Sequence, residues 1–189
     1  MLKDLVIQNR SYRRFYQDTV ITLDTLKELV ELARLSASGG NQQPLKYILS
    51  NEPLKNVIIF QTLAWARLIE GWGGPKVGER PSAYIIILHD KEVSPSYFCD
   101  QGIAAQTILL GAAEKDLGGC MLGAIKKDEL RKALNIADRY DILLVLALGK
   151  PREKVVIETV GTDGSTKYWR DSKEVHHVPK RALKDIIVG

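Results

Sequence analysis

The eight residues AYIIILHD, at positions 83–90, hold a continuous run of apolar side chains. Such a short and uniformly apolar run is typical of a strand buried on both faces, because a half-buried strand alternates apolar with polar residues. The preceding stretch GWGGPKVGERP, residues 71–81, has four glycines and two prolines, which favour an irregular connection. We therefore expect residues 83–90 to form a central strand of the fold.

Further strands are expected on both sides of this one. DILLVLALGKP, residues 141–151, is a second long apolar run, closed by Gly149 and Pro151. KYILS, residues 46–50, indicates a strand begun just after Pro44, and GGCMLGAI, residues 118–125, has room for a short one.

Helical signals fall between these runs. Apolar residues recur at helical spacing after Met1 up to about Asn9, and again from an N-cap at Thr22 to a point before Ser36. Three more helices are expected over residues 54–71, 97–117 and 126–136, although VIIF at 57–60 is also compatible with a strand. Helices thus alternate with a small buried sheet, and we expect an α/β fold with a single domain over residues 1–189.

The helix expected at 97–117 is rich in small residues. Glycine and alanine side chains let another helix approach closely, so this segment is expected to be deeply packed or to lie in a subunit interface. The small residues are Gly102, Ala104, Ala105, Gly111, Ala112 and Ala113.

Composition excludes several classes of protein. The 189 residues are 45% hydrophobic and 26% charged, and no apolar run reaches the roughly 20 residues of a membrane helix. The net charge of +4 is too small to imply a nucleic-acid surface. The start of the chain lacks a signal-peptide pattern, so we expect a cytoplasmic protein without membrane or nucleic-acid partners. Cys99 and Cys120 lack metal-ligand spacing and are expected to be reduced and buried.

NRSYRRF, residues 9–15, concentrates positive charge near the start of the chain. Arg10, Ser11, Arg13 and Arg14, with Lys180 and Arg181 near the other end, can build a phosphate site, because guanidinium groups and a hydroxyl supply several charge-assisted hydrogen bonds. The alternative interpretation is a set of solvated surface charges. Tyr12 and Phe15 favour the first interpretation, since they can pin the loop to the core.

Two glycine-containing loops are further candidates. SASGGNQQP, residues 36–44, lets the backbone approach a flat ligand and offers amide donors and acceptors, but Gly39 or Gly40 can equally be a helix C-cap. DLGGCMLGAI, residues 116–125, can point backbone amides at a ligand, or Gly118 and Gly119 can simply end the preceding helix.

Other catalytic patterns are missing. The glycine clusters match neither the P-loop nor the GxGxxG fingerprint, and no GxSxG motif or Cys–His spacing indicates covalent catalysis. His176 and His177 are adjacent, so they lack metal-ligand spacing, and we expect a loop or supporting role for them. An organic cofactor is therefore the more plausible source of chemistry.

Taken together, four stretches resemble a known family. NRSYRRF resembles the RRSxRxF signature of the FMN-dependent nitroreductases, SASGGNQQP their PSxxNxQPW loop, and DLGGCMLGAI their GLGxCWLGxF segment. The VPKR stretch near the C-terminus also agrees in order and spacing. Each motif is weak alone, and the four in sequence are fairly specific.

The resemblance implies a set of cofactor-binding residues. Arg10 and Ser11 would hold the FMN phosphate with Lys180 and Arg181, and Arg13 would reach the pyrimidine edge of the flavin. The remaining implied residues are Ser38, Asn41 and Gln43, which in this family come partly from the other subunit, and Leu122 and Gly123, whose backbone amides would lie near flavin N5.

The resemblance also implies a fold and an activity. The expected fold is an α+β sandwich with a mostly antiparallel sheet, assembled as an intertwined homodimer with FMN at the interface. The expected reaction is a ping-pong hydride transfer from NADH or NADPH through flavin N5 to a small electron acceptor, such as a nitroaromatic or a quinone, with no catalytic protein side chain. Alternatives are a same-fold flavoprotein with different chemistry, such as dehalogenation or flavin breakdown, and a non-catalytic flavin- or nucleotide-binding module.

Four positions depart from the family pattern. Asn9 replaces an arginine, Ala37 a proline, and Leu45 and Met121 each a tryptophan. The first departure is expected to change phosphate binding, and the others to alter packing beside the flavin ring.

Overall fold

The computed structural model describes residues 1–66, 68–69 and 71–189. The helices and strands alternate along most of the chain, as expected from the sequence. The helices are α1 (Leu2–Gln8), α2 (Leu23–Arg34), α3 (Pro53–Gln61), α4 (Asp100–Glu114) and α5 (Lys127–Leu134), with short 3₁₀ turns at Gly39–Asn41 and Leu183–Asp185. The strands are β1 (Phe15–Tyr16), β2 (Leu45–Ser50), β3 (Ala83–Asp90), β4 (Gly118–Leu122), β5 (Tyr140–Pro151), β6 (Val155–Thr159), β7 (Trp169–Arg170) and β8 (His176–Lys180).

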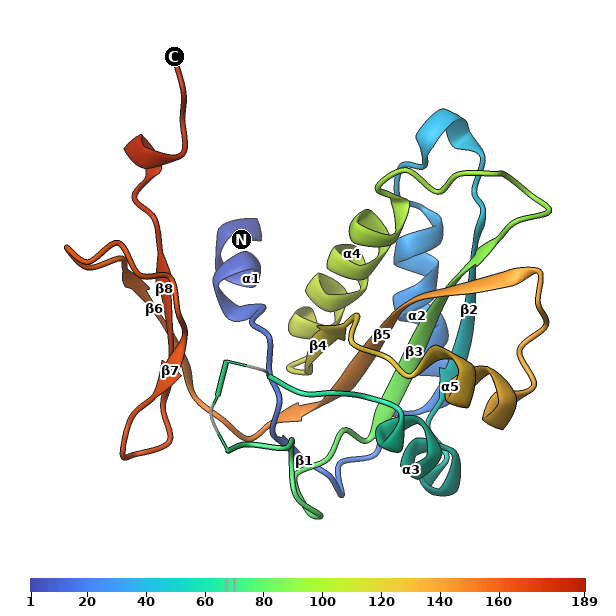
Figure 1. The fold of residues 1–189 in the computed structure, drawn as a ribbon, viewed down its shortest axis with the longest axis horizontal. Coiled ribbons are helices and arrows are strands. Elements are labelled where there is room, and N and C mark those ends of the chain that lie inside the picture. The colour runs from blue at the N-terminus through green and yellow to red at the C-terminus, as the bar shows by residue number, and fades with distance from the viewer. Residues whose placement is uncertain (67, 70) are drawn as a thin grey trace.

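The main sheet is built around β3 and β5. Its order is β1-β5-β3-β2, with β4 also paired to β5, and every one of these pairings is antiparallel. All eight residues of β3 are buried, which confirms that AYIIILHD is a central strand. The expected mostly antiparallel sheet is therefore present (Figure 1).

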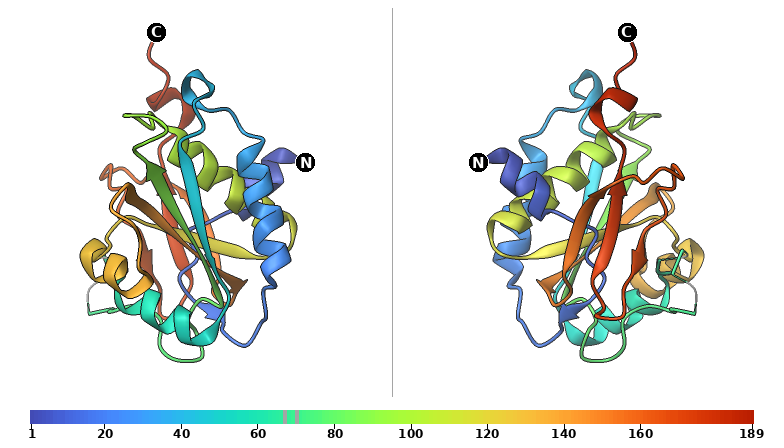
Figure 2. Two further views of the ribbon diagram at one scale, coloured as in Figure 1. Left: turned by 90° about the vertical axis from the view of Figure 1, so that its right-hand side faces the viewer. Right: turned by 90° about the vertical axis from the view of Figure 1, so that its left-hand side faces the viewer.

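The sheet is covered on both faces. Side chains of β3 alternate between two cores because successive residues of a strand point to opposite faces. Ile85 and Ile87 pack with α2 and α4, whereas Tyr84 and Ile86 pack in a second cluster with Ile59 of α3 and residues of α5. The molecule is an α+β sandwich, and the side views show the helix layers on either side of the sheet (Figure 2).

The small residues of α4 serve helix packing. Gly111 lies so close to α2 that a Cβ atom there would be 2.4 Å from Leu32 Cδ1. Ala104, Ala105 and Ala112 are buried in the same core. The expectation of a deeply packed helix is confirmed.

The C-terminal part of the chain forms a second sheet, which the sequence analysis did not foresee. Its order is β6-β8-β7, with β6 parallel and β7 antiparallel to β8. It stands beside the main body, next to α1 (Figure 1). The final segment extends away from the body, and its apolar side chains are exposed: Leu183, Ile186, Ile187 and Val188.

Several expectations were wrong. The third helix ends at Gln61 rather than near residue 71, because the Thr62 hydroxyl donates to the Ile59 carbonyl and the chain then pairs with residues 124–126. Arg67 and Glu70 lie outside the described residues. Cys99 is exposed, since it precedes α4 on the surface, whereas Cys120 is buried as expected.

The glycine-cap interpretations were also wrong. α2 ends at Arg34, five residues before Gly39, where the Gly39–Asn41 turn begins, and α4 ends at Glu114 with Lys115 as its C-cap. Gly118 and Gly119 instead lie inside β4. No helix in the described part of the chain is long and apolar enough to cross a bilayer.

Candidate functional site

The arginine-rich stretch is held to the sheet by backbone and aromatic contacts. Ser11 forms a parallel bridge with Gly119, and the Tyr12 amide donates to the Gly119 carbonyl at 3.0 Å. Phe15 is fully buried against Gly149. Gly119 has no room for a side chain, because a Cβ atom there would lie 2.6 Å from the Ala147 carbonyl oxygen. The N-terminal donors are therefore fixed at the edge of β4.

The two ends of the chain meet at one cavity. Because strand side chains alternate, His176, Val178 and Lys180 share one face of β8, and this face looks toward the N-terminal segment. The cavity has a volume of about 370 Å³. It is lined by Asn9, Arg10, Ser11 and Arg13, by Gln106 and Leu109 of α4, by Met121 of β4, by Tyr168, and by the three residues of β8.

Arg13 lies between two rings of the C-terminal segment. Its guanidinium carbon is 5.0 Å from the centre of the Tyr168 ring, and its Nη1 is 3.4 Å from His176 Nε2. Burial, and next the charge of Arg13, lower the pKa of His176 from 6.5 to about 4. His176 is therefore neutral at physiological pH and adds no charge to the cavity.

The cavity is strongly cationic. Within the described residues, the side chains of Arg10, Arg13 and Lys180 take part in no ion pair with a carboxylate. Two buried nitrogen atoms at the cavity, Arg10 Nε and His176 Nδ1, have no hydrogen-bond partner among the described residues. Unpaired buried donors and positive charge together favour an anionic, oxygen-rich ligand such as a phosphate.

Arg14 does not join this cavity, contrary to the expectation from the sequence. Its side chain donates to both carboxylate oxygens of Glu79, at 2.9 and 2.8 Å, and to Glu174 at 2.6 Å. The hydrogen bond to Arg14 is the main cause that lowers the pKa of the Glu79 carboxyl. Arg14 thus joins the main body to the C-terminal segment.

The loop candidates lie elsewhere on the single chain. Ser38 donates its hydroxyl to Asp100 at 2.6 Å and accepts from the Gln43 amide at 2.9 Å. Asn41 and Gln43 have positive φ angles of 55° and 52°, which are uncommon for residues with a side chain. None of the three lines the cavity at Arg13 within one chain.

Other predicted residues are also displaced from the cavity. Leu122 is buried, Gly123 and Arg181 are exposed, and none of them lines it, whereas Met121 does. Gln106 and Tyr168 were not predicted from the sequence. His176 lies in the strand β8 rather than in a loop, and its contact with Arg13 agrees with the supporting role that was the other expectation.

Comparison with known proteins identifies the family. Residues 6–150 match the model of the nitroreductase family, which covers well over half of the chain. The chain belongs to the nitroreductase family. The match includes the arginine-rich stretch and the main sheet up to the penultimate residue of β5, and it ends before β6.

Three proteins described as nitroreductases resemble this chain in sequence or in fold. A protein of Archaeoglobus fulgidus named "Putative NADH dehydrogenase/NAD(P)H nitroreductase" is 26% identical over 159 residues, which cover 79% of this chain and 85% of the relative. A nitroreductase family protein from Streptococcus pneumoniae TIGR4 superposes with a TM-score of 0.72 at 16% identity and covers both chains completely. An FMN-dependent nitroreductase from Clostridium difficile R20291 has a TM-score of 0.65 at 21% identity, covering 79% of this chain and 87% of its own.

Two of the departures from the nitroreductase pattern lie in the cavity itself. Asn9 is 8% exposed and lines it beside Arg10, and Met121 lines it from β4. An asparagine carries no charge, so the cavity has one cation fewer than the family pattern. Ala37 and Leu45 instead line a different pocket beside Ser38.

Proposed function

We propose that this nitroreductase family member is an FMN-dependent NAD(P)H oxidoreductase that passes hydride to a small electron acceptor, such as a nitroaromatic or a quinone. The observation that supports the proposal most directly is the cavity where both ends of the chain meet. Arg10, Ser11, Arg13 and Lys180, four residues named from sequence for FMN, line it together. The flavin would supply the hydride-accepting chemistry, because the amino-acid side chains that line the cavity do not accept hydride.

The residues of the cavity suit such a cofactor. Arg10, Ser11 and Lys180 offer charged and hydroxyl donors to a phosphate. Arg13 presents a guanidinium that Tyr168 and His176 hold in place, and it would stabilise negative charge at the edge of the ring it contacts. The neutral state of His176 keeps this interaction from becoming a repulsion between two cations.

We further propose a homodimer. In one chain, Ser38, Asn41 and Gln43 do not reach the cavity, so their role toward FMN requires a second copy. The exposed apolar end of the chain from Leu183 to Val188 supports association, because isolated monomers rarely leave such a segment uncovered.

The test is reconstitution of the purified chain with FMN. We expect flavin absorbance to remain with the protein after gel filtration, at the elution volume of a dimer, and to bleach under anaerobic addition of NADH or NADPH. Re-oxidation by a nitroaromatic or a quinone, followed by product analysis, then identifies the acceptor. A protein that cannot be reconstituted with FMN, or whose bound FMN is not bleached by either nicotinamide, would overturn the proposal.

A further inference from the structure

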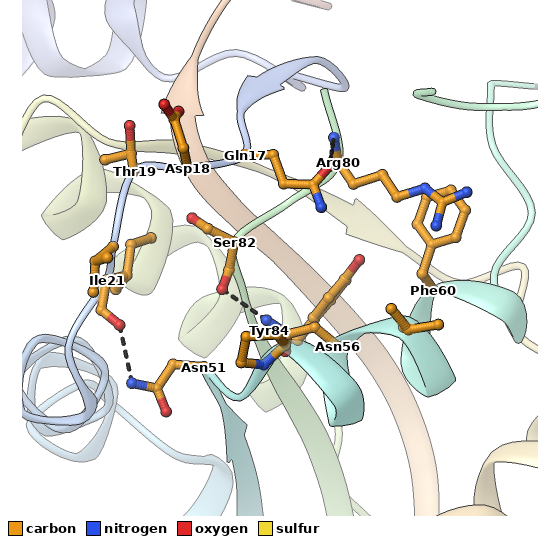
Figure 3. Close-up of a pocket in the computed structure, with 13 residues that line it drawn as sticks. Gln17, Asp18, Thr19, Ile21, Asn51, Asn56, Phe60, Arg80, Ser82 and Tyr84 are labelled. Carbon is orange, nitrogen blue, oxygen red and sulfur yellow. Dashed lines mark hydrogen bonds between the residues drawn. The ribbon is translucent and has the colours of Figure 1, made fainter. Parts of the chain in front are cut away.

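A second cavity lies between the start of β3, the helix α3 and the segment that follows β1. Its volume is about 320 Å³, and it shares no lining residue with the cavity at Arg13. Figure 3 shows Ser82 and Tyr84 near its centre, Gln17 above them, Arg80 reaching over the Phe60 ring at the right, and Asn56 of α3 beside Tyr84. The sequence motifs gave no indication of this cavity.

Three polar side chains reach it from alternate positions of one extended stretch. Arg80, Ser82 and Tyr84 are two residues apart, so they share a face of the chain leading into β3. The next residue on that face, Ile86, belongs to the apolar core. The face therefore changes from apolar to polar where it meets the cavity.

All three side chains carry a buried atom without a hydrogen bond. Arg80 Nε, Ser82 Oγ and Tyr84 Oη are buried and have no partner among the described residues. Tyr84 is the most telling, because it is only 1% exposed and burial raises the pKa of its phenol. A buried hydroxyl that lacks a partner costs free energy, and a ligand oxygen would remove this cost.

Neighbouring amide groups add donors rather than acceptors. Gln17 Oε1 accepts from the backbone amides of Gly78 and Arg80, at 2.7 and 3.3 Å. This fixes the orientation of the amide, so its NH₂ group is the end directed into the cavity (Figure 3). The oxygen of Asn56 is already occupied by Ser50, and its NH₂ donates to the Ser82 carbonyl. The cavity thus has an excess of donors.

The positive charge of Arg80 lies close to these donors. Its guanidinium carbon is 4.2 Å from the centre of the Phe60 ring. Burial raises the pKa of the Tyr84 phenol, and the positive charge of Arg80 partly offsets this rise. In the described part of the chain, no carboxylate forms an ion pair with Arg80. Asp18 lies at the rim, is exposed, and points its carboxylate away from the centre (Figure 3).

The floor of the cavity is apolar. Pro53, Val57 and Phe60 of α3 line it, together with the ring of Tyr84. A ligand that suits both parts has an oxyanion at one end and a short apolar body at the other.

We propose that this cavity binds a small organic carboxylate, with the carboxylate between Arg80 and Tyr84 and the apolar body against α3. A carboxylate fits because it accepts several hydrogen bonds at once and matches a guanidinium in shape. The proposal is independent of the flavin assignment, since the two cavities share no residue.

The first experiment compares two ligands of nearly equal shape. Phenylacetate and its neutral amide, phenylacetamide, are titrated into the ¹⁵N-labelled full-length protein while amide chemical shifts are recorded. We expect saturable binding of phenylacetate with a dissociation constant on the order of 1 mM, as suits a ligand of this size. The shifts should concentrate at residues 17–21 and 80–84, and phenylacetamide should bind at least about tenfold more weakly. Equal binding of the two ligands, or no saturable binding, would overturn the proposal.

The second experiment uses matched variants. Arg80→Gln should weaken phenylacetate binding by about tenfold or more and Tyr84→Phe by about fivefold, because each removes one donor. Tyr84→Phe keeps the buried ring and removes a hydroxyl that has no partner, so it should fold with unchanged or higher stability. Arg13→Ala is the control and should leave phenylacetate binding unchanged. Binding that depends on Arg13 and not on Arg80 would assign the ligand to the other cavity and refute this site.

Discussion

Two pairs of neighbouring residues, Arg13–Arg14 and His176–His177, divide between opposite environments. Arg14 and His177 face carboxylates: Arg14 binds Glu79 and Glu174, and His177 binds Glu158 and Asp171. Arg13 and His176 face each other and the cavity. Successive side chains of an extended chain point to opposite sides, so the two residues of each pair have different partners. On one side, Arg14 joins the C-terminal segment to the body and His177 ties together residues within that segment. On the other side, the positive charge of Arg13 stays available for a ligand.

The largest expected effect comes from breaking the carboxylate side. Arg14→Met would leave Glu79, whose side chain is only 5% exposed, with Arg152 at 3.9 Å as its remaining partner. A buried charge that loses its main partner is costly, so the free energy of unfolding should fall by about 3 kcal/mol. Urea denaturation followed by circular dichroism measures this loss. Arg13→Ala is the matched control, and an equal loss in both variants would erase the distinction between the two arginines.

The same ion pair predicts a pH dependence. The pKa of Glu79 is lowered in the folded protein, chiefly by its hydrogen bond to Arg14. Its stabilising contribution is therefore complete above the ordinary carboxyl pKa of 4.5 and is lost as the pH falls through the lowered value. In Arg14→Met this part of the pH dependence of the free energy of unfolding should be missing. Denaturation curves collected between about pH 3 and pH 6, the range in which carboxyl groups titrate, can detect the difference.

Arg13→Ala tests the cavity side. The side chain has no carboxylate partner among the described residues, and its contacts with the Tyr168 ring and the Ser11 carbonyl are lost, so the free energy of unfolding should fall by about 1 kcal/mol. FMN affinity, measured by quenching of flavin fluorescence, should fall by about tenfold to a hundredfold, since one charged hydrogen bond is lost. In protein that still binds FMN, the flavin potential should also fall, and an unchanged potential would exclude Arg13 from the edge of the ring.

A third pair of neighbours sharpens the comparison. Lys180 lines the cavity and Arg181 does not. Lys180→Ala should weaken FMN binding by about threefold to tenfold, a moderate effect because the lysine is exposed and its charge is screened. Isothermal titration of both alanine variants would compare them directly. A larger loss for Arg181→Ala would mean that a partner subunit brings this residue to the cofactor.

The smallest effect is spectroscopic. Burial lowers the pKa of His176 to about 4, whereas hydrogen bonds to Glu158 and then Asp171 raise the pKa of His177. The ion pairs of His177 therefore stabilise the fold below the ordinary histidine pKa of 6.5 and lose this contribution as the pH rises through the raised value. NMR titration of the ring nitrogens should show His176 neutral down to about pH 4 and His177 protonated above pH 6.5. Two rings that titrate together would contradict the division of environments.

The sequence was sufficient for β2, β3, β4 and β5 of the main sheet and for the presence of its helices because their signals are local, whereas the two-residue strand β1 was not expected. The apolar run of β3 predicts a strand buried on both faces, and the small residues of α4 predict a closely packed helix; both are buried in the structure. The third helix was extended too far because Leu63 and Trp65 continue its apolar pattern, although they pack against residues of other elements. The strand β6 was missed because its residues are only half-buried or exposed, so its sequence lacks a clear apolar run.

The candidate site was only partly predictable. Arg10, Ser11, Arg13 and Lys180 carry charge or a hydroxyl in recognisable motifs, and they do line one cavity. Tyr168 gave no such signal, because its place depends on how the second sheet lies against Arg13. Arg13 and Arg14 have different partners because neighbouring side chains of an extended chain point to opposite sides. The sequence of an arginine cluster does not show which arginine faces the cavity.

The burial of β3 on both faces has a consequence for how the molecule comes apart. Because this strand supplies side chains to both hydrophobic cores, neither helix layer can detach without exposing a row of isoleucines to water. The two layers should therefore melt as one cooperative unit, and the amide protons of β3 should exchange with solvent only when the whole molecule opens.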